Sequence, residues 1–472
     1  MQKTISQNVK ENIELFDQIL SVGKNFDALT RKVIIGEREC VMYFIDGFVK
    51  DELFQKLMEY FNSINKEDMP SHAEDFLKLY IPYIEVGIMT DVEAITTSVL
   101  SGMAVMFVDG YNECITIDTR TYPARSVEEP DKDKVLRGSR DGFVETIVFN
   151  TALIRRRIRS PKLIMKMMNA GTTSKTDIVL CYMEDRVNKE FLDKLINRIN
   201  NIKADSLSMN QESLTELLYP KKWLNPFPKF KFTERPDATA ATVLEGSIAI
   251  LVDNSPSAIL LPTTIFDIVE EADEYYFPPV TGTYLKLSKL LVNILAVLLT
   301  PTFLLLTMRP EWVPSWLEFI KIKDVVNVPI FMQLLILEFA IDGLRLASIN
   351  TPTMLSTPLS VVAGLIVGDF AASSGWFNPE TMLYMAFVTL ANYTQANLEL
   401  GYALKFMRII IVILTSIFDI WGFIAGILFT VICICFNRTI SGKSYIYPLI
   451  PFNGQQLLRR VLRVNIHNTT KS

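Results

Sequence analysis

Three charged side chains stand inside one of the most apolar segments of this sequence. Glu338, Asp342 and Arg345 are spaced at i, i+4 and i+7, so a helix would place them on one face. A charge at the centre of a bilayer costs about 2.5–3.5 kcal/mol on insertion scales, so such residues pair with one another or line a water-filled path. Both interpretations are open: Asp342 and Arg345 could form an ion pair that holds helices together, or the face could line an ion path. The surplus acid Glu338 slightly favours a path for cations.

Small residues in the next apolar segment indicate close packing between helices. Gly364 and Gly368 have the GxxxG spacing, and Asp369 follows directly. Small residues allow helix backbones to approach each other, which predicts a central position or a subunit interface for this segment. Asp369 is a further candidate for the polar face inside the membrane.

A second charged cluster lies well before the apolar segments. Its members are Glu128, Glu129, Arg137, Arg140, Asp141, Glu145, Arg155, Arg156, Arg157 and Arg159. The last four arginines fall near the C-terminal end of a predicted helix, where the helix dipole favours cations. The cluster could bind an anion or a lipid headgroup. The near balance of acids and arginines favours instead a charge network that connects two parts of the soluble region.

The residues needed for enzyme chemistry are scarce. The chain has only two histidines, His72 and His467, and five cysteines without a CxxC motif. Residues 170–176 resemble the end of a phosphate-binding loop but lack the glycine before Lys175, so a nucleotide site is not expected. We therefore predict no catalytic site, no metal site and no cofactor, and a protein that is not an enzyme.

The apolar segments predict an integral membrane protein. An α-helix rises about 1.5 Å per residue, so a bilayer core of about 30 Å needs roughly 20 apolar residues. Five segments are candidates: residues 290–308, 328–349, 359–376, 381–400 and 406–436. Together they predict an all-α transmembrane bundle over residues 286–436.

Charge is distributed unevenly around this block and predicts its orientation. Residues 1–285 carry a net charge of −10, and the tail 437–472 carries +6. The acidic front argues against nucleic-acid binding, while Lys286, Lys289 and the basic tail place both ends in the cytosol by the positive-inside rule. Two cytosolic ends require an even number of crossings. We prefer a segment 359–376 that does not cross fully; the alternative is a hairpin near Asp419 within residues 406–436.

The soluble region contains an internal duplication. Residues 99–109 match residues 243–253 without a gap, and residues 41–46 resemble residues 179–185 at nearly the same offset. The first match combines helix, glycine, strand and acidic turn, and the second a strand, an acid and then a helix, which predicts two similar α/β subdomains. We place the first, with the charged connector, at residues 1–170 and the second at residues 171–285, both ahead of the bundle and the basic cytosolic tail 437–472.

Several short motifs resemble the A subunits of GerA-type spore germinant receptors. They lie at residues 128–130, 137–138, 141–145, 150–159, 174–177, 234–237 and 252–256, and the resemblance covers nearly the whole chain. The resemblance implies a multi-pass protein of the spore inner membrane that acts in germination. It also implies a ring-like homo-oligomer in contact with membrane lipid, with properties of an ion channel.

The same resemblance leaves two kinds of partner open. Motifs at residues 282–285, 341–345, 351–353 and 447–453 are similar to a branch that acts with the SpoVA proteins, which release dipicolinate, and that amplifies the signal. From this we expect an ion-channel-like or signal-amplifying subunit. The alternative is the A subunit of a nutrient germinant receptor, with receptor subunits as partners. A secondary transporter is a further alternative, although no inverted repeat is evident among the apolar segments.

Overall fold

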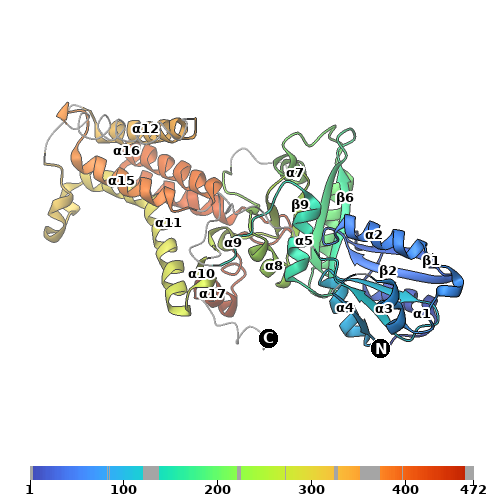
Figure 1. The fold of residues 1–472 in the computed structure, drawn as a ribbon. Coiled ribbons are helices and arrows are strands. Elements are labelled where there is room, and N and C mark those ends of the chain that lie inside the picture. Colours follow the sequence, from blue (N-terminus) through green and yellow to red (C-terminus); the bar gives the residue numbers. More distant parts are fainter. Residues whose placement is uncertain are drawn as a thin grey trace. The chain divides into compact units, whose positions relative to one another are not determined.

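The computed structural model describes residues 4–81, 83, 85–120, 138–219, 225–271, 273–323, 328–350, 373–395 and 397–462. The chain divides into two compact units, the first formed by residues 1–221 and 230–262, the second by residues 222–229 and 263–472. The first unit is drawn from blue to green in Figure 1 and contains both β-sheets. The second unit is helical.

The first unit contains two five-stranded sheets with the same strand order. The first sheet has the order β1-β2-β4-β5-β3, with β1 (Ala28–Ile35), β2 (Arg38–Ile45), β3 (Val86–Met89), β4 (Ala104–Val108) and β5 (Cys114–Ile117). The second has the order β6-β7-β9-β10-β8, with β6 (Leu163–Ala170), β7 (Thr176–Met183), β8 (Lys231–Thr233), β9 (Ile248–Val252) and β10 (Ala258–Leu261). All neighbouring strands are antiparallel. The identical order confirms the prediction of two similar subdomains.

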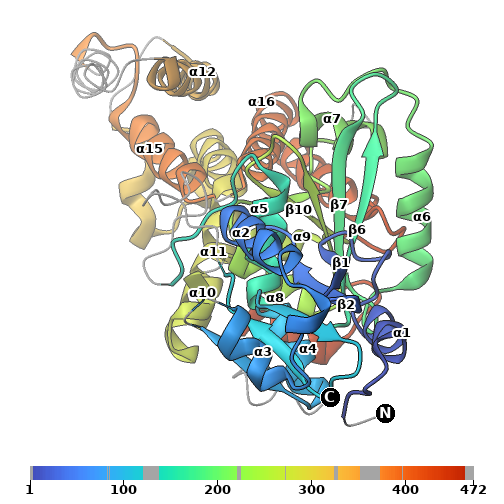
Figure 2. The same cartoon turned by 45° about the vertical axis from the view of Figure 1, so that its right-hand side comes forward.

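Helices cover both faces of each sheet. In the first subdomain α1 (Val9–Ile19) and α4 (Val92–Leu100) lie on one face, and α2 (Asp51–Asn62) and α3 (Ala73–Tyr80) on the other, with the short helix η1 (Lys66–Asp68) beside them. In the second, α5 (Ile147–Arg157) and α8 (Pro236–Leu244) pack on one face, and α6 (Lys189–Asn200) and α7 (Asn210–Leu218) belong to the other (Figure 2).

Strand alternation explains why each sheet is buried on both faces. In β2, Val41 and Tyr43 join the core under α1 and α4, while Cys40 and Met42 join the core under α2 and α3. A strand with apolar residues at every position, such as β4 or β9, suits a sheet covered on both sides.

Local details repeat as well. Gly102 and Gly246 both have a φ of +99°, a conformation that favours glycine, at the turn between the helix and the strand that follow one another in each subdomain. Asn12 bonds the main chain of Ser6, and Asn150 bonds Val144 in the same two-bond arrangement. The duplication therefore extends beyond the stretches in which the sequence shows it.

The second unit contains the apolar helices. Among its described residues the elements are α9 (Ile265–Val269), α10 (Asp273–Tyr276), α11 (Pro279–Met308), η2 (Pro310–Trp312), η3 (Ser315–Ile320), α12 (Ile330–Asn350), α15 (Pro379–Tyr393), α16 (Leu398–Cys435) and α17 (Gly454–Val461). Within the part of the chain that the structure describes, two helices, α11 and α16, are long and apolar enough to cross a membrane by length and composition. This finding supports membrane association.

Helix α16 is a hairpin of two helical legs. Asp419 interrupts it with φ 54° and ψ −133°. A side chain at Gly422 would meet the carbonyl oxygen of Leu414, and one at Gly426 would meet Ile411, so the chain folds back on itself here. We call residues 398–418 the first leg and 420–435 the second leg. The hairpin is the arrangement considered above near Asp419; the preferred alternative concerns residues 359–376, most of which lie outside the described residues.

The directions of the helices define two ends of the bundle. The carbonyl of Ala296 meets Arg408 and Arg309 meets Asp419, so α11 and the first leg run in the same direction. Gln333 and Asn378 are hydrogen-bonded, so α12 and α15 begin at the same end. We call the end with Pro279 and Cys435 the base, and the end with Met308 and Asp419 the tip. The apolar block thus enters and leaves at the base.

Candidate functional site in the helical bundle

The charged face of α12 is turned toward the first leg of α16. The two helices run antiparallel, with Glu338 beside Arg408 and Arg345 beside Tyr402. Glu338 lies near the middle of α12, and Arg408 near the middle of the first leg. The charges therefore begin halfway along the bundle and continue toward its base.

Arg408 is the most enclosed member of this group. Its guanidinium donates to both carboxylate oxygens of Glu338, at 2.6 and 3.0 Å, and to the carbonyl oxygen of Ala296 in α11 at 2.6 Å. Only 1% of Arg408 is exposed. Pro301 lacks the N–H that would bond the carbonyl of Val297, the residue after Ala296, so the hydrogen-bond ladder of α11 is interrupted next to this contact. One arginine thus joins three helices.

Lys405 lies one turn closer to the base than Arg408. Its ammonium is 3.2 Å from Glu338 Oε2 and 2.5 Å from Asp342 Oδ2, and it donates to the carbonyl oxygen of Glu338 at 3.1 Å. Glu338 therefore has two cationic partners, and Asp342 has one. These bonds satisfy groups whose burial would otherwise be costly.

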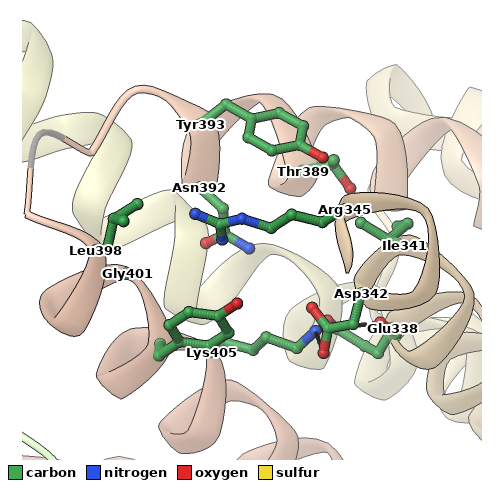
Figure 3. A pocket seen from close by; sticks show the side chains of 11 residues that line it. Glu338, Ile341, Asp342, Arg345, Thr389, Asn392, Tyr393, Leu398, Gly401 and Lys405 are labelled. Atoms are coloured by element: carbon green, nitrogen blue, oxygen red, sulfur yellow. Dashed lines mark hydrogen bonds and ion pairs between the residues drawn. The ribbon is translucent and has the colours of Figure 1, made fainter. Parts of the chain in front are cut away.

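Arg345 does not pair with Asp342, in contrast to the ion-pair interpretation of the sequence. Its guanidinium carbon lies 5.1 Å from the ring centre of Tyr402 and 5.9 Å from that of Tyr393 (Figure 3). Asp342 pairs instead with Lys405 of the facing helix, whose ammonium lies 2.5 Å from Asp342 Oδ2. Arg345 has no acidic partner among the residues that the structure describes.

The charge balance of the cluster differs from the sequence-based interpretation. Glu338 and Asp342 are matched by Lys405 and Arg408, so Glu338 is not a surplus acid. With Arg345 added, the five side chains carry one positive charge in excess. The argument for a cation path from a surplus Glu338 is therefore wrong, although the polar face itself is present.

A small cavity opens beside these charges. Its lining is drawn in Figure 3 and includes Asp342, Arg345, Asn392 and Tyr402. Its volume is about 20 Å³, room for on the order of one water molecule. Asn392 Oδ1 is buried there and accepts no hydrogen bond from the described residues, and the Asp342 side chain is 33% exposed. The base side of the polar face is thus partly open, whereas its middle is closed.

Polar contacts continue from the middle of the bundle toward its tip. Gln333 donates to Asn378 Oδ1 at 2.7 Å and accepts from the Asn378 N–H at 2.9 Å, with both side chains buried. At the tip itself Arg309 donates to Asp419 at 2.7 and 2.5 Å and lies over the ring of Trp312. The bundle is therefore fastened by polar contacts at its middle and at its tip.

Lys405 and Arg408 were not identified from the sequence. They lie within the apolar run 398–435 at i and i+3, a spacing that puts two cations on one helix face. That spacing, set against the acids of the segment 328–349, is the signal that could have found them. Gly364, Gly368 and Asp369 lie outside the described residues.

The connector arginines have separate partners. Arg155 is completely buried and donates to both carboxylate oxygens of Asp27, at 2.8 and 2.9 Å, joining the two subdomains. Arg157 donates to Asp141 Oδ2 at 2.9 Å. This geometry fits the interpretation as a charge network, but the acid that holds Arg155 comes from the first subdomain rather than from the connector.

The remaining connector residues are placed as follows. Arg140, Glu145, Arg156 and Arg159 are exposed, and Glu128, Glu129 and Arg137 lie outside the described residues. Within the described ranges, no three His, Cys, Asp or Glu side chains come together in a way that could hold a metal ion.

Comparison with protein families and curated proteins gives consistent matches. The family described as Bacillus/Clostridium GerA spore germination protein matches residues 15–472. The chain is 36% identical over 462 residues to Stage V sporulation protein AF of Bacillus subtilis, covering 97% of this chain and 93% of that protein. It is 28% identical over 436 residues to Spore germination protein GerLA of Bacillus cereus, covering 91% and 88%.

One solved structure is also similar. It is the N-terminal domain of the A subunit of the Bacillus megaterium spore germinant receptor GerK3, with 25% sequence identity and a TM-score of 0.42. The match covers 56% of this chain and 98% of that chain.

Proposed function

Because the chain belongs to the GerA family of spore germination proteins, we propose that it is a membrane subunit that conducts ions or amplifies the germination signal. It acts in the spore inner membrane as a multi-pass protein, with its two-sheet unit and its basic tail in the cytosol. It has no catalytic activity of its own. Its partners are SpoVA proteins, in keeping with its similarity to Stage V sporulation protein AF.

The polar column along α12 carries the proposal. From tip to base it consists of Gln333 with Asn378, Glu338 with Arg408, Asp342 with Lys405, and Arg345 between Tyr393 and Tyr402. An apolar helix that only anchors a protein needs none of these groups, each of which is costly in lipid. The column is the part of the bundle best suited to water and ions.

The partly exposed base side of the column supports a homo-oligomer. A carboxylate that is 33% exposed, such as Asp342, is poorly solvated by lipid tails. Neighbouring copies in a ring would cover this face and enclose water against it. In a single copy the Glu338–Arg408 pair closes the middle, so conduction requires these two side chains to separate or the path to pass beside them.

Ion flux in proteoliposomes tests the proposal. Arg345→Ala removes the excess positive charge without breaking an ion pair, so it should alter conductance or ion preference several-fold while the protein still inserts. Ser348→Ala, on an exposed part of the same helix, is the matched control and should leave flux unchanged. Equal flux in both variants and the unmodified protein, at equal protein level, would reject a conducting role for this face.

The second candidate is the A subunit of a nutrient germinant receptor. The 28% identity to GerLA over most of both chains favours it. Purification from spores in mild detergent separates the two candidates. Recovery of SpoVA proteins supports the first, and recovery of germinant-receptor subunits supports the second.

A further inference from the structure

A cavity at the base of the bundle lies apart from the polar column. It is lined by residues of α9, α10, the start of α11, both legs of α16, α17 and the segment between α16 and α17, and it is partly open, since Leu287 and Leu290 in its lining are 45% and 43% exposed. Its volume is about 260 Å³, larger than the roughly 150 Å³ of an engineered apolar cavity that binds benzene. A group of at least that size therefore fits.

The walls of the cavity are apolar, and its rim is charged. Leu287, Leu290, Leu400, Leu404 and Ile434 contribute to the walls. Such walls favour the hydrocarbon body of a ligand, since burying it removes apolar surface from water.

The rim belongs to a belt of ion pairs. The acids are Asp267, Glu270, Glu271 and Glu274, and the cations are Lys286, Lys289 and Arg460. Arg460 is 2.7 Å from both Asp267 and Glu270, which holds α17 in place beside the cavity. These ion pairs connect α9, α10, α11 and α17 at one edge of the cavity.

Two buried acceptors in the lining lack hydrogen-bond donors. Glu274 is 1% exposed, and its Oε2 accepts no hydrogen bond from the described residues, although Lys286 Nζ lies 3.5 Å away. Asn293 Oδ1 is also buried without a donor from those residues. Burial raises the pKa of Glu274, against the lowering effect of Lys289 and Lys286. N–H donors bound at these two atoms would satisfy acceptors that otherwise carry a desolvation penalty.

We propose that this cavity binds an ammonium group carried on an apolar body, with the body against the leucine-rich wall and the N–H groups directed to Glu274 and Asn293. The ammonium could belong to a free small amine or to the headgroup of an aminophospholipid. The inference is independent of whether the polar column conducts ions.

Paired probes of the same shape test this proposal. The full chain in phosphatidylcholine nanodiscs is titrated with phenethylamine and with 2-phenylethanol, and binding is followed by calorimetry and by the shift in unfolding temperature. The amine should bind about tenfold more tightly or better, because a charge-assisted hydrogen bond contributes more than that of a neutral hydroxyl. Equal affinities for the amine and the alcohol would overturn the proposal.

Substitutions in the ion-pair belt and in the apolar wall show whether the probes bind in this cavity. Glu274→Gln should abolish the preference for the amine while leaving the alcohol's affinity unchanged, which also shows that the cavity is intact. Glu271→Gln is the matched control, since Glu271 belongs to the belt but does not line the cavity. Leu290→Trp should fill the cavity and remove binding of both probes. An equal loss in Glu271→Gln and Glu274→Gln would contradict the assignment.

A further experiment, in which the lipid composition of the nanodiscs is changed, identifies the source of the ammonium. Replacing part of the phosphatidylcholine by phosphatidylethanolamine should weaken phenethylamine binding if the lipid headgroup occupies the site. Unchanged phenethylamine affinity would assign the site to a free amine.

Discussion

Buried arginines connect distant parts of this chain. Arg155 is enclosed with Asp27 in the first unit, and Arg408 with Glu338 in the second. In both pairs a guanidinium meets two carboxylate oxygens, an arrangement that suits its planar fork. The two pairs have the same chemistry but different tasks, because one joins soluble subdomains and the other stands inside the apolar bundle.

Removing one partner of the Asp27–Arg155 pair should destabilise the first unit. Asp27→Ala leaves Arg155 buried without its carboxylate, at a cost of about 3–5 kcal/mol. Pulse proteolysis of the full chain across a urea series would measure the loss. Lys162→Ala is the control, since its partner Asp185 and Lys162 itself are partly exposed and such pairs contribute about 0–1 kcal/mol. Similar effects of both substitutions would contradict the structural role of Arg155.

The thiols of the two sheets should be unreactive. Burial raises the pKa of both Cys114 and Cys181 well above the usual range, so almost no thiolate is present at neutral pH. Mass spectrometry after brief iodoacetamide treatment should find both unmodified in the folded protein and modified in urea. Rapid labelling of either thiol in the folded state would disagree with the buried strands β5 and β7.

At the scale of elements, the α16 hairpin depends on glycine where its legs meet. A Cβ at Gly422 would lie 1.8 Å from the Leu414 carbonyl oxygen, and one at Gly426 would lie 2.9 Å from Ile411 Cγ1. Only hydrogen fits at Gly422, whereas at Gly426 the side chain of Ile411 and its Cα, 3.0 Å from the new Cβ, would both have to shift by a few tenths of an ångström. The closest approach is therefore next to the turn at Asp419.

Substitution of these glycines should have graded effects. Gly422→Ala should prevent the legs from closing and abolish accumulation in the membrane, and Gly426→Ala should destabilise the bundle by about 1–3 kcal/mol through overpacking. The control Gly343→Ala, with no atom within 4 Å of the new Cβ, should be neutral or stabilising. Protein level in the membrane fraction and unfolding temperature are the measurements. A stable Gly422→Ala protein would rule out the hairpin.

At the scale of the whole molecule, the helix directions place the two exits of the apolar block at one end. Lys286 is bound to Glu270 at the base, and the Tyr445 hydroxyl donates to the Pro228 carbonyl in the same unit. The tip instead carries the Arg309–Asp419 pair and Trp312. Base and tip should therefore face opposite sides of the membrane.

Cysteine accessibility tests that arrangement. In a cysteine-free background, Trp316→Cys should react with a membrane-impermeant maleimide only from the side of the tip, and Ser441→Cys only from the side of the base. Intact and permeabilised vesicles distinguish the two sides. Labelling of both positions from the same side would exclude the arrangement.

The sequence by itself determined the class of each part of the chain. Apolar runs of membrane length predicted the helical bundle, and the match between residues 99–109 and 243–253 predicted two similar α/β subdomains. These features are local or repeat at a fixed offset along the chain, so they can be recognised from the sequence alone. The expected division after residue 170 falls in the β6–β7 hairpin, because matching short segments does not show which sheet a strand joins.

Only the tertiary structure decided which charges meet. Glu338, Asp342 and Arg345 were evident from spacing, but the cations that pair with Glu338 and Asp342 come from α16, and Arg408 follows Glu338 by 70 residues. Periodicity places residues on a face and does not state what that face contacts. The direction and register of packed helices decide that, which is why Asp342 pairs with Lys405 and Arg345 remains with Tyr393 and Tyr402.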